Sequence, residues 1–509
     1  MKRFRVLLAL LFYFSILPIL PGWAAPVIDD LRVKKTPWVD VTAHMSALTY
    51  VAWYVAPSLV DVTSEMKAAI AAVDNNGTIL LPKGTYVLGE DVVVQKDNVT
   101  VTGWGATIKM KDDFYTYGNY QMMTFSGRGL SVVGVTFDGN KANQTTGNMN
   151  GVKLTSLTDA KFLYCTWVNF GYHAIFIQDV VNLLVLGNRF TNCYGEGNAA
   201  EIYSSGAGNT GAFVGNYYSR DIYPWNTDNT NGGQAYYMHA GEFTYTGDSM
   251  DNVSIGYDFR SGHHVVSGVI LRNVNTVLQA GTTGKNPTVD ASHIDARGVN
   301  GCDTHCGSTV SGFNIFSGDV RISDVRAVAL DTSTTLSWMF RVQHSAADNA
   351  YLSSVVLSNI DSTGPSAAHY YVNLADNSVT IDRATVRNRG YAAVGFRTES
   401  NTGIIYVRNP VLDNIATPFT NSDGMQRVSG TDNSCKTEGG DKVAYDNVAF
   451  LTVTHGLCTG ITPNSFTISF DNTNVGKWSV SNEGTSTFKI STDNAVVGAN
   501  VRWKAEKVY

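Results

Sequence analysis

The stretch from Gly129 to Tyr218 carries one pattern four times, as GLSVVGVTFDGN (129–140), TDAKFLYCTWVNF (158–170), VVNLLVLGNRFTNC (180–193) and NTGAFVGNYYSRD (209–221). Each copy is a short alternating apolar run, a Gly or Asn at a corner, and a second run ending in an aromatic residue. The copies are 30, 23 and 27 residues apart if their equivalent aromatics are Phe137, Trp167, Phe190 and Tyr217. This spacing fits one turn of a solenoid, whose units must stack to bury their apolar faces.

The composition favours β structure with many tight corners. The chain has 509 residues, of which 44% are hydrophobic and only 16% charged, and it contains 48 glycines and 25 tyrosines. Helices need more of the strong helix formers, whereas aromatic and β-branched residues suit strands. The formal net charge of −6 argues against nucleic acid as a partner.

Residues 1–25 have the three parts of a secretory signal peptide. Lys2, Arg3 and Arg5 precede the apolar run 6–20, and small residues at 24–25 offer a cleavage site. A retained N-terminal anchor is the alternative. We therefore expect a secreted or periplasmic protein, with a cell-surface or virion-associated location as the other option.

Cysteines in an exported chain indicate disulfides more than zinc. Cys165 and Cys193 fall at related places in neighbouring repeats, where they either pair or stack as small apolar side chains. Cys302 and Cys306 flank a tripeptide, and Cys435 and Cys458 are candidates to staple the C-terminal region. The sequence alone does not decide which cysteines bond.

A single helix precedes the strands. Residues 26–60 form a lead-in segment without clear periodicity. From Thr63 to Val73, a hydroxyl cap precedes apolar residues at helical spacing, and Asn75-Asn76-Gly77 ends the helix because Asn and Gly accept a left-handed backbone. We expect this helix to cover the open end of a stack of about ten to twelve turns.

The run TSEMKAAIAAVDNNGTILLPKGTYVL (63–88), with VGVTFDGN (133–140), resembles the N-terminal signature of the pectate-lyase-like superfamily. This group contains polysaccharide lyases, polygalacturonase-related hydrolases and phage tailspike depolymerases. The resemblance implies an all-β fold, a right-handed single-stranded parallel β-helix over residues 61–417 behind an N-terminal capping helix. It does not define the function, since one scaffold carries many chemistries.

The C-terminal part reads as a separate unit. Residues 418–442 are polar and glycine-rich, which is typical of a linker. Residues 443–509 alternate cleanly and predict a small antiparallel β-sandwich. This part resembles the C-terminal β domains of phage tail fibres and tailspikes, which implies glycan adhesion and a homotrimer through the C-terminal domain as options.

The first candidate catalytic residues lie in the loop GCDTHCG (301–307). Asp303 stands two residues before His305, so both point to one face of an extended chain and the carboxylate can orient the imidazole. The structural alternative is a disulfide-closed corner in which the Asp caps backbone amides. Zinc held by the cysteines and the histidine is a third option.

The second candidates are Arg260 and His263 in DFRSGHH (258–264). Adjacent histidines on a strand point to opposite faces, so His263 and His264 cannot both face a substrate. The run resembles motifs of polygalacturonase relatives, but a neighbouring Asp-Asp pair and the full Arg-Ile-Lys triplet are missing. If they have no catalytic role, Arg260 and His263 are ordinary residues at a corner of the coil.

Substrate contacts are predicted nearby. Glu196 and Glu201 lie around a glycine corner, and His173 lies one turn earlier, although corner carboxylates also bind backbone amides in many solenoids. Aromatic side chains that can stack on sugar rings are Tyr223, Trp225 and Tyr237, with Tyr236 and Tyr245 beside them.

These residues predict an exported enzyme that degrades a polysaccharide lying along the β-helix. Cleavage of a uronic-acid polymer by a lyase is favoured over hydrolysis, because no motif of paired carboxylates is evident. In this hypothesis His305 is the base or acid, Arg260 binds a substrate carboxylate and His263 is a secondary acid or base. Calcium is a candidate cofactor and no protein metal ligand is assigned. The alternatives are a non-catalytic glycan-binding or tailspike-like adhesin and a uronan C5-epimerase.

Overall fold

The computed structural model describes residues 38–114, 121–144, 150–193, 200–219, 233–282, 285–299, 311–329, 336–343, 352–364, 366–373, 378–387, 394–399, 404–408, 411–413 and 417–422 of the helical part of the chain. In the C-terminal part it describes residues 437–445, 448–454, 465–470, 478–482, 487–496 and 499–506. The predicted signal peptide lies outside these ranges.

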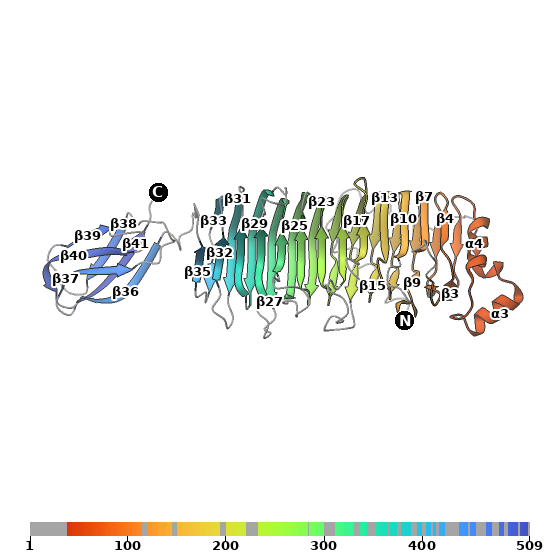
Figure 1. Ribbon diagram of the computed structural model, residues 1–509, viewed down its shortest axis with the longest axis horizontal. Coiled ribbons are helices and arrows are strands. Elements are labelled where there is room, and N and C mark those ends of the chain that lie inside the picture. Colours follow the sequence, from red (N-terminus) through yellow and green to blue (C-terminus); the bar gives the residue numbers. More distant parts are fainter. Residues whose placement is uncertain are drawn as a thin grey trace, which may run out of the picture.

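The chain folds as a right-handed parallel β-helix, as the sequence predicts (Figure 1). In the described ranges, one face of the coil is a thirteen-stranded parallel sheet with one strand from each turn, so the stack is longer than expected. Its strands are β4 (Val92–Gln95), β7 (Gln121–Arg128), β10 (Asn150–Thr158), β13 (Ile175–Val181), β16 (Ala200–Ser204), β19 (Gln234–Met238), β22 (Ile255–Phe259), β24 (Thr276–Ala280), β26 (Ser311–Ile315), β28 (Leu336–Gln343), β30 (Ser366–Asn373), β32 (Val394–Glu399) and β35 (Thr417–Ser422).

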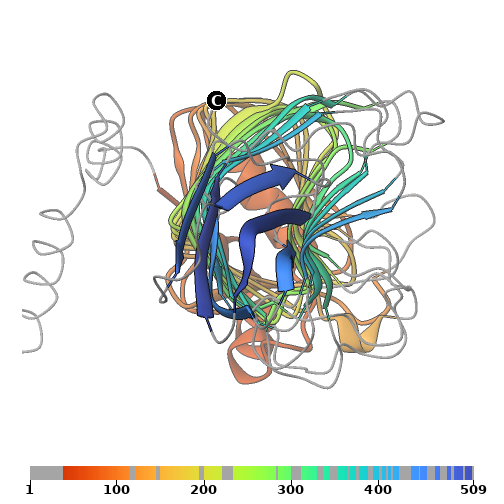
Figure 2. The ribbon, with the colours of Figure 1, turned by 90° about the vertical axis from the view of Figure 1, so that its left-hand side faces the viewer.

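A second parallel sheet, with twenty-two strands in the described ranges, closes the coil, and Figure 2 shows the turns stacked around one axis. It consists of β1 (Trp38–Asp40), β2 (Thr78–Leu80), β3 (Gly84–Leu88), β5 (Thr100–Thr102), β6 (Ala106–Met110), β8 (Ser131–Val133), β9 (Thr136–Asp138), β11 (Lys161–Leu163), β12 (Thr166–Val168), β14 (Leu183–Leu186), β15 (Arg189–Thr191), β17 (Thr210–Val214), β18 (Tyr217–Ser219), β20 (Glu242–Thr246), β21 (Ser249–Asp251), β23 (Gly262–Arg272), β25 (Pro287–Val299), β27 (Gly318–Ala329), β29 (Leu352–Thr363), β31 (Ser378–Arg387), β33 (Ile404–Arg408) and β34 (Val411–Asp413).

One left-handed residue bends each turn of the second sheet at an equivalent place. The residues with positive φ at this corner are Gly134, Tyr164, Gly187, Gly215, Gly247, Gly268, His293, Asp324, Asn359 and Arg383. At Gly187 the need for glycine is also steric, since a Cβ atom there would lie 2.7 Å from the Tyr164 ring of the preceding turn. The corners predicted at Gly or Asn are therefore real, and later turns use other residues at the same place.

The core consists of aromatic columns that run along the helix axis. The ring of Trp167 stacks between Phe137 at 4.3 Å and Phe190 at 5.8 Å, and Phe190 stacks on Tyr218 at 4.7 Å. The sequence analysis aligned Tyr217 with this column, which is wrong by one residue. Because side chains of a strand alternate between faces, Tyr217 points outward under Arg189 while Tyr218 is buried.

A ladder of buried amides runs beside the aromatic column. The side chain of Asn188 accepts a hydrogen bond from the Cys165 amide at 3.0 Å, Asn216 accepts from the Asn188 amide at 3.0 Å, and Asp248 accepts from the Asn216 amide at 2.8 Å. Each of these side chains satisfies a backbone amide of the preceding turn that no strand pairing reaches. The ladder therefore fixes how one turn sits on the next.

Cys165 and Cys193 do not pair with each other. Both are buried in the core, and their sulfur atoms contact backbone carbonyl oxygens of Val132 and Trp167 respectively. Of the two readings of these residues, stacking as small apolar side chains is correct. The other four cysteines lie outside the described residues.

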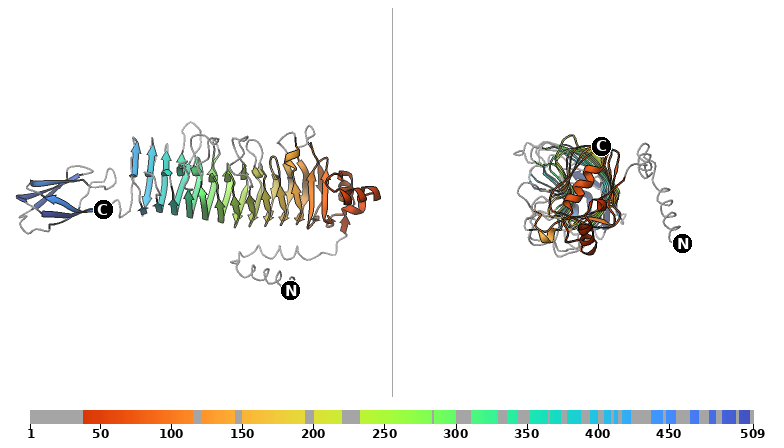
Figure 3. Two further views of the ribbon diagram at one scale, coloured as in Figure 1. Left: turned by 90° about the horizontal axis from the view of Figure 1, so that it is seen from below. Right: turned by 90° about the vertical axis from the view of Figure 1, so that its right-hand side faces the viewer.

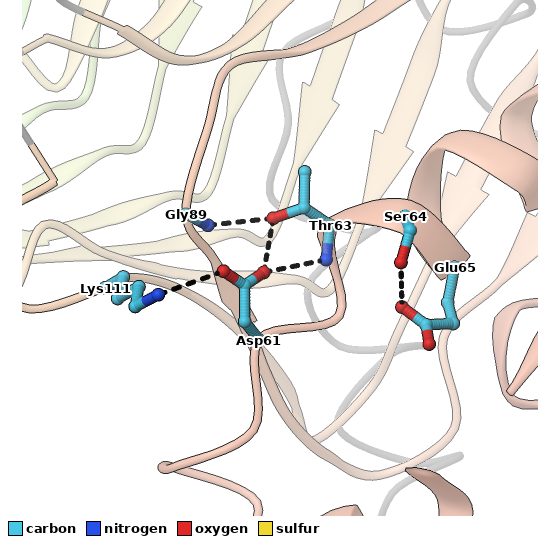
Figure 4. Close-up of polar contacts among 6 residues, drawn as sticks. All are labelled: Asp61, Thr63, Ser64, Glu65, Gly89 and Lys111. Atoms are coloured by element: carbon cyan, nitrogen blue, oxygen red, sulfur yellow. Dashed lines mark hydrogen bonds and ion pairs between the residues drawn. The ribbon is translucent and has the colours of Figure 1, made fainter. Parts of the chain in front are cut away.

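The N-terminal end is covered by two helices, as Figure 3 shows. Helix α4 (Thr63–Ala72) is the predicted capping helix, and Met66 and Ile70 on it are buried. Its N-terminus is capped differently from the prediction. The carboxylate of Asp61, rather than a hydroxyl, accepts hydrogen bonds from the Thr63 amide at 3.0 Å and hydroxyl at 2.6 Å, and Lys111 lies 3.4 Å from it (Figure 4).

The lead-in segment has more structure than its sequence indicates. The 3₁₀ helix η1 (Val41–His44) and helix α3 (Ala47–Val55) follow β1, and β1 pairs in parallel with β2. Helix α3 is held by Trp53, whose indole nitrogen donates to the Thr85 carbonyl at 2.6 Å while its ring packs on Tyr86. One buried indole, rather than an apolar stripe, therefore anchors this helix, which is why periodicity missed it.

The C-terminal strands form two antiparallel three-stranded sheets, at the end of the molecule opposite to α4 (Figure 1). The first contains β36 (Thr437–Tyr445), β41 (Ala499–Glu506) and β38 (Ser465–Phe470), and the second contains β37 (Val448–Thr454), β40 (Thr487–Val496) and β39 (Trp478–Asn482). The predicted sandwich strands are thus present. Strands β35 and β36 extend into both ends of the segment 418–442 that the sequence assigns to a linker.

The amide ladder yields a stability prediction. Asn216→Ala leaves the amide of Asn188 and the carbonyl of Val185 without their side-chain partner inside the protein, so it should lower the free energy of unfolding by about 2 kcal/mol or more. Urea denaturation measures this. The control is Asn143→Ala, which removes an exposed asparagine that donates to Asn140 and should cost about 0.5 kcal/mol or less. Equal losses in the two variants would contradict the role of the ladder.

Candidate functional site

Several predicted site residues lie outside the described residues. These are Asp303 and His305, with their flanking cysteines, and Glu196, Tyr223 and Trp225. Glu201 belongs to strand β16, but its side chain is outside the description. The proposed roles of these residues stay predictions.

The two adjacent histidines point to opposite faces, as the sequence predicts for a strand. His264 is fully buried, with its ring stacked on Phe259 at 4.1 Å and its Nε2 atom 2.9 Å from the Ser261 carbonyl. His263 faces outward on β23, where its Nε2 atom lies 3.5 Å from the carboxylate of Asp290. Burial lowers the pKa of His264 to about 4, so the buried ring is neutral at ordinary pH.

Arg260 and His263 lie at different sheets. Arg260 follows β22 of the thirteen-stranded sheet, whereas His263 belongs to β23 of the other sheet. Among the contacts of the described residues, none joins the two side chains. The two candidates therefore do not form one catalytic group here, and Arg260 has other neighbours.

The outward residues of the thirteen-stranded sheet form a continuous row. Because consecutive strands pair in parallel register, equivalent positions face the same side at each turn. From β10 to β32 this row is Lys153, Phe176, Tyr203, Tyr237, Asp258, Gln279, Asn314, Arg341, Tyr371 and Arg397. Aromatic and charged side chains thus gather on one face although they are far apart in sequence.

The densest part of the row is a cluster of rings around His239, the residue that follows β19. Its imidazole lies 5.3 Å from the ring of Tyr203 and 4.5 Å from that of Tyr237. His173 stacks on the other side of Tyr203 at 4.5 Å. Tyr203 is half-buried, as is Phe176, which stacks on it at 5.1 Å, so both rings keep area for a ligand.

The predicted aromatic contacts need correction. Tyr236 and Tyr245 are fully buried in the core and cannot stack on a sugar. Their side chains alternate inward on β19 and β20, which follows from the two-residue period of a strand. Tyr237 points outward but is only 8% exposed, and His173 only 2%, so both support the surface more than they form it.

Arg260 is held in place by a buried carboxylate. Its Nη2 atom donates to Asp258 at 2.7 Å, and its guanidinium lies 5.3 Å above the ring of Tyr237. Asp258 is fully buried, and this burial raises the pKa of its carboxyl group to about 6 although Arg260 acts to lower it. Arg260 itself stays partly exposed, and its Nε atom is buried without a partner. The pair therefore presents a fixed cation at the surface.

His239 is a neutral base in a positive environment. Burial, followed by the charges of Lys285 and Arg260, lowers the pKa of His239 to about 4. Its Nε2 atom is buried and has no hydrogen-bond partner. A neutral imidazole with a free nitrogen can accept a proton, and the neighbouring cations can hold an anion beside it.

Sequence reasoning missed His239 and the supporting role of Asp258. Both stand at or just after a strand end in runs with twofold alternation, YYMHAG and YDFRSG. That alternation places them on the outward face, but the sequence does not say which turns lie side by side. The sequence therefore indicates the orientation of each residue, but it does not show that these residues form a cluster.

A metal site has no support in the described part of the chain. No group of three or more His, Cys, Asp or Glu side chains gathers there in a way that could hold an ion. The one carboxylate next to Arg260 is already ion-paired, so it does not fit as a calcium ligand. Separately, none of the helices in the described ranges has the length and apolar character that crossing a bilayer requires.

Comparisons with known proteins agree with the fold. No family model and no curated protein matches the sequence. Among solved structures, the chain is similar to the tailspike protein of E. coli bacteriophage HK620 in complex with pentasaccharide, with a TM-score of 0.52 and 13% identity over 89% of this chain and 90% of that one. A double mutant of the same tailspike gives 0.51 and 13% identity, covering 95% of both chains.

An exopolygalacturonase of Yersinia enterocolitica gives a TM-score of 0.47 and 10% identity over 75% of this chain and 79% of that one. The tailspike similarities, with TM-scores above 0.5, establish the fold. The chain thus has a parallel β-helix architecture, as its N-terminal motif predicts.

The buried histidine yields a pH prediction. The pKa of His264 is about 4 in the folded protein and 6.5 ordinarily, so between these values the unfolded chain binds a proton that the folded protein does not. The stability that His264 contributes is therefore complete above about pH 6.5 and is lost as the pH falls toward 4. Between about pH 7 and pH 4.5, the wild type should lose about 2 kcal/mol more unfolding free energy than His264→Phe.

Denaturant unfolding at the two pH values measures this difference. His263→Phe, which changes the exposed neighbour on the same strand, is the control and should follow the wild type. If His264→Phe loses as much stability as the wild type, the buried imidazole is not the titrating group.

Proposed function

We propose that the protein binds an acidic polysaccharide along the outward row of the thirteen-stranded sheet and cleaves it by β-elimination. The observation that carries this proposal is the pairing of a fixed, partly exposed guanidinium, Arg260, with a neutral histidine, His239, around the ring of Tyr237. The fold supports a carbohydrate ligand in a general way, since a tailspike of similar fold was solved in complex with pentasaccharide.

In this proposal the two side chains divide the chemistry. Arg260 binds the carboxylate of a uronic acid, which makes the neighbouring C5 proton more acidic. The neutral imidazole of His239 takes that proton, the electron pair forms the C4–C5 double bond, and the bond from C4 to the glycosidic oxygen breaks. The leaving oxygen takes a proton from water. Tyr203 offers the apolar face of a sugar a surface to stack on.

Elimination is favoured over hydrolysis for one reason. Hydrolysis needs two carboxyl groups that can both reach the glycosidic bond. In the described part of this cluster, the carboxylate is Asp258, which is buried and ion-paired. Glu196, Glu201 and Asp303 stay candidates for a second carboxyl, and the predicted pair of His305 and Asp303 stays a candidate acid or base.

We further propose that the protein is secreted, periplasmic or displayed on a surface, and that the C-terminal sheets mediate trimer formation. No step of the mechanism above uses calcium, because the Arg260 guanidinium supplies the positive charge. The second candidate function is a glycan-binding adhesin, which the exposed aromatic surface of Tyr203 would serve without any chemistry.

The direct test is to incubate the purified protein with uronic-acid polymers and neutral glycans while recording the absorbance of unsaturated products and the release of reducing ends. We expect new double bonds with an acidic polymer. His239→Gln should lower kcat by about a hundredfold or more, whereas Arg260→Lys should chiefly raise KM because a bidentate partner is lost. Protonation of His239 should lower the activity as the pH falls through about 4.

His263→Gln is the matched control and should keep wild-type rates, because His263 lies at the other sheet. Reducing ends without absorbance would indicate a hydrolase instead. Binding without either product would indicate the adhesin. Full activity in His239→Gln would show that this histidine is not the base.

A further inference from the structure

A second group of aromatic and cationic side chains lies on the same outward row, toward the C-terminal end. The guanidinium of Arg341 on β28 lies 4.9 Å from the ring of Trp338 and 5.5 Å from that of Phe316. Trp338 in turn stacks on Tyr371 of the next strand at 4.4 Å. Three strands thus hold one arginine between aromatic rings.

Arg341 lacks the carboxylate that Arg260 has. Its Nη2 atom donates to the side chain of Gln343, and its Nε atom is buried and has no hydrogen-bond partner among the described residues. Within the described ranges no Asp or Glu forms an ion pair with it. Burial lowers the pKa of Arg341, although an arginine remains charged at any ordinary pH. A half-buried cation without a counterion is unfavourable, and an anionic ligand would relieve that cost.

The register gives the separation of the two cations along the molecule. Tyr237, over which Arg260 lies, is followed in the row by Asp258, Gln279, Asn314 and then Arg341. Four strand spacings of about 4.8 Å make roughly 19 Å. The amide side chains of Gln279 and Asn314 lie between in the row. Amides suit the hydroxyl groups of sugars.

We propose that Arg341, Trp338 and Phe316 form a second binding subsite, which takes the carboxylate of another uronic acid in the same chain that Arg260 binds. The proposal rests on the proposed function for the nature of the polymer. Trp338 supports the sugar ring, and Arg341 fixes its carboxylate. A chain long enough to reach both cations gains affinity because its second contact is intramolecular, whereas a shorter one gains nothing.

The test uses uronic acid dimers and octamers prepared from polygalacturonate and from alginate, with tryptophan fluorescence and calorimetry as readouts. An octamer that binds should change the fluorescence of Trp338, and this change should be missing in Trp338→Phe. Arg341→Ala should weaken octamer binding about tenfold or more and leave dimer binding and dimer cleavage unchanged. Arg341→Lys should restore part of the lost octamer affinity, since lysine keeps the positive charge but lacks the planar guanidinium group that binds a carboxylate through two nitrogens.

The matched control is Arg321→Ala, an exposed arginine of the other sheet that lies near Asp319 and Asp290; it should bind octamers like the wild type. If the alanine variant does not fold, Arg341→Met replaces it, because methionine keeps the packing of the aliphatic part of the side chain. Unchanged octamer affinity in a folded Arg341 variant overturns the subsite. If Arg341→Ala weakens the octamer but no product forms in any assay, the subsite stands and the proposed cleavage fails. If the wild type binds neither the polygalacturonate octamer nor the alginate octamer, both proposals are wrong.

Discussion

The stacking of each turn on the one before it, in register, is the constraint on which the rest of this structure depends. A left-handed residue bends every turn at the same place, from Gly134 to Arg383, and the ladder through Asn188, Asn216 and Asp248 bonds the backbone of one turn to side chains of the next. Buried amides of this kind are costly when left unpaired, so a turn that shifted by one residue would lose both its bonds and its core.

Register also explains how a site can form from distant residues. Tyr203, Tyr237 and Asp258 lie on consecutive strands, so their side chains lie one strand spacing apart. The electrostatics of the site follow from burial on that face. Asp258 is sealed beneath the surface and fixes Arg260, while Arg260 and Lys285 help to keep His239 neutral. On the same face, Arg341 has no ion-pair partner among the described residues. The proposed ligand path therefore extends well beyond the cluster around His239.

The sequence predicts the fold well because the fold has local causes. Alternation, corner glycines and a capping helix are all readable in short windows, and the opposite faces of His263 and His264 follow from the period of a strand. The error at Tyr217 was a choice between two adjacent tyrosines, since Tyr218 stands three residues after the corner Gly215 as Phe190 stands three after Gly187. Helix α3 was missed because Trp53 alone anchors it, which leaves no periodic stripe.

The site was less predictable because its neighbours are set by stacking rather than by sequence distance. His239 and Arg260 are 21 residues apart in the sequence. The connections between strands differ in length, and the one that contains residues 220–232 is long. Spacing in the sequence therefore does not show which strands are neighbours. Only the observed pairing shows that Tyr203 meets Tyr237. Motif reasoning found Arg260 through its basic neighbours, but it grouped that residue with His263, which the bend after β22 directs to the other sheet.

The most direct test of the account is an experimental structure of His239→Gln with a bound uronic acid octamer. The account predicts an extended sugar chain on the outward row of the thirteen-stranded sheet, with one carboxylate at Arg260 and another at Arg341. Density for the sugar on the twenty-two-stranded sheet around His263, or on the C-terminal sheets, would contradict it.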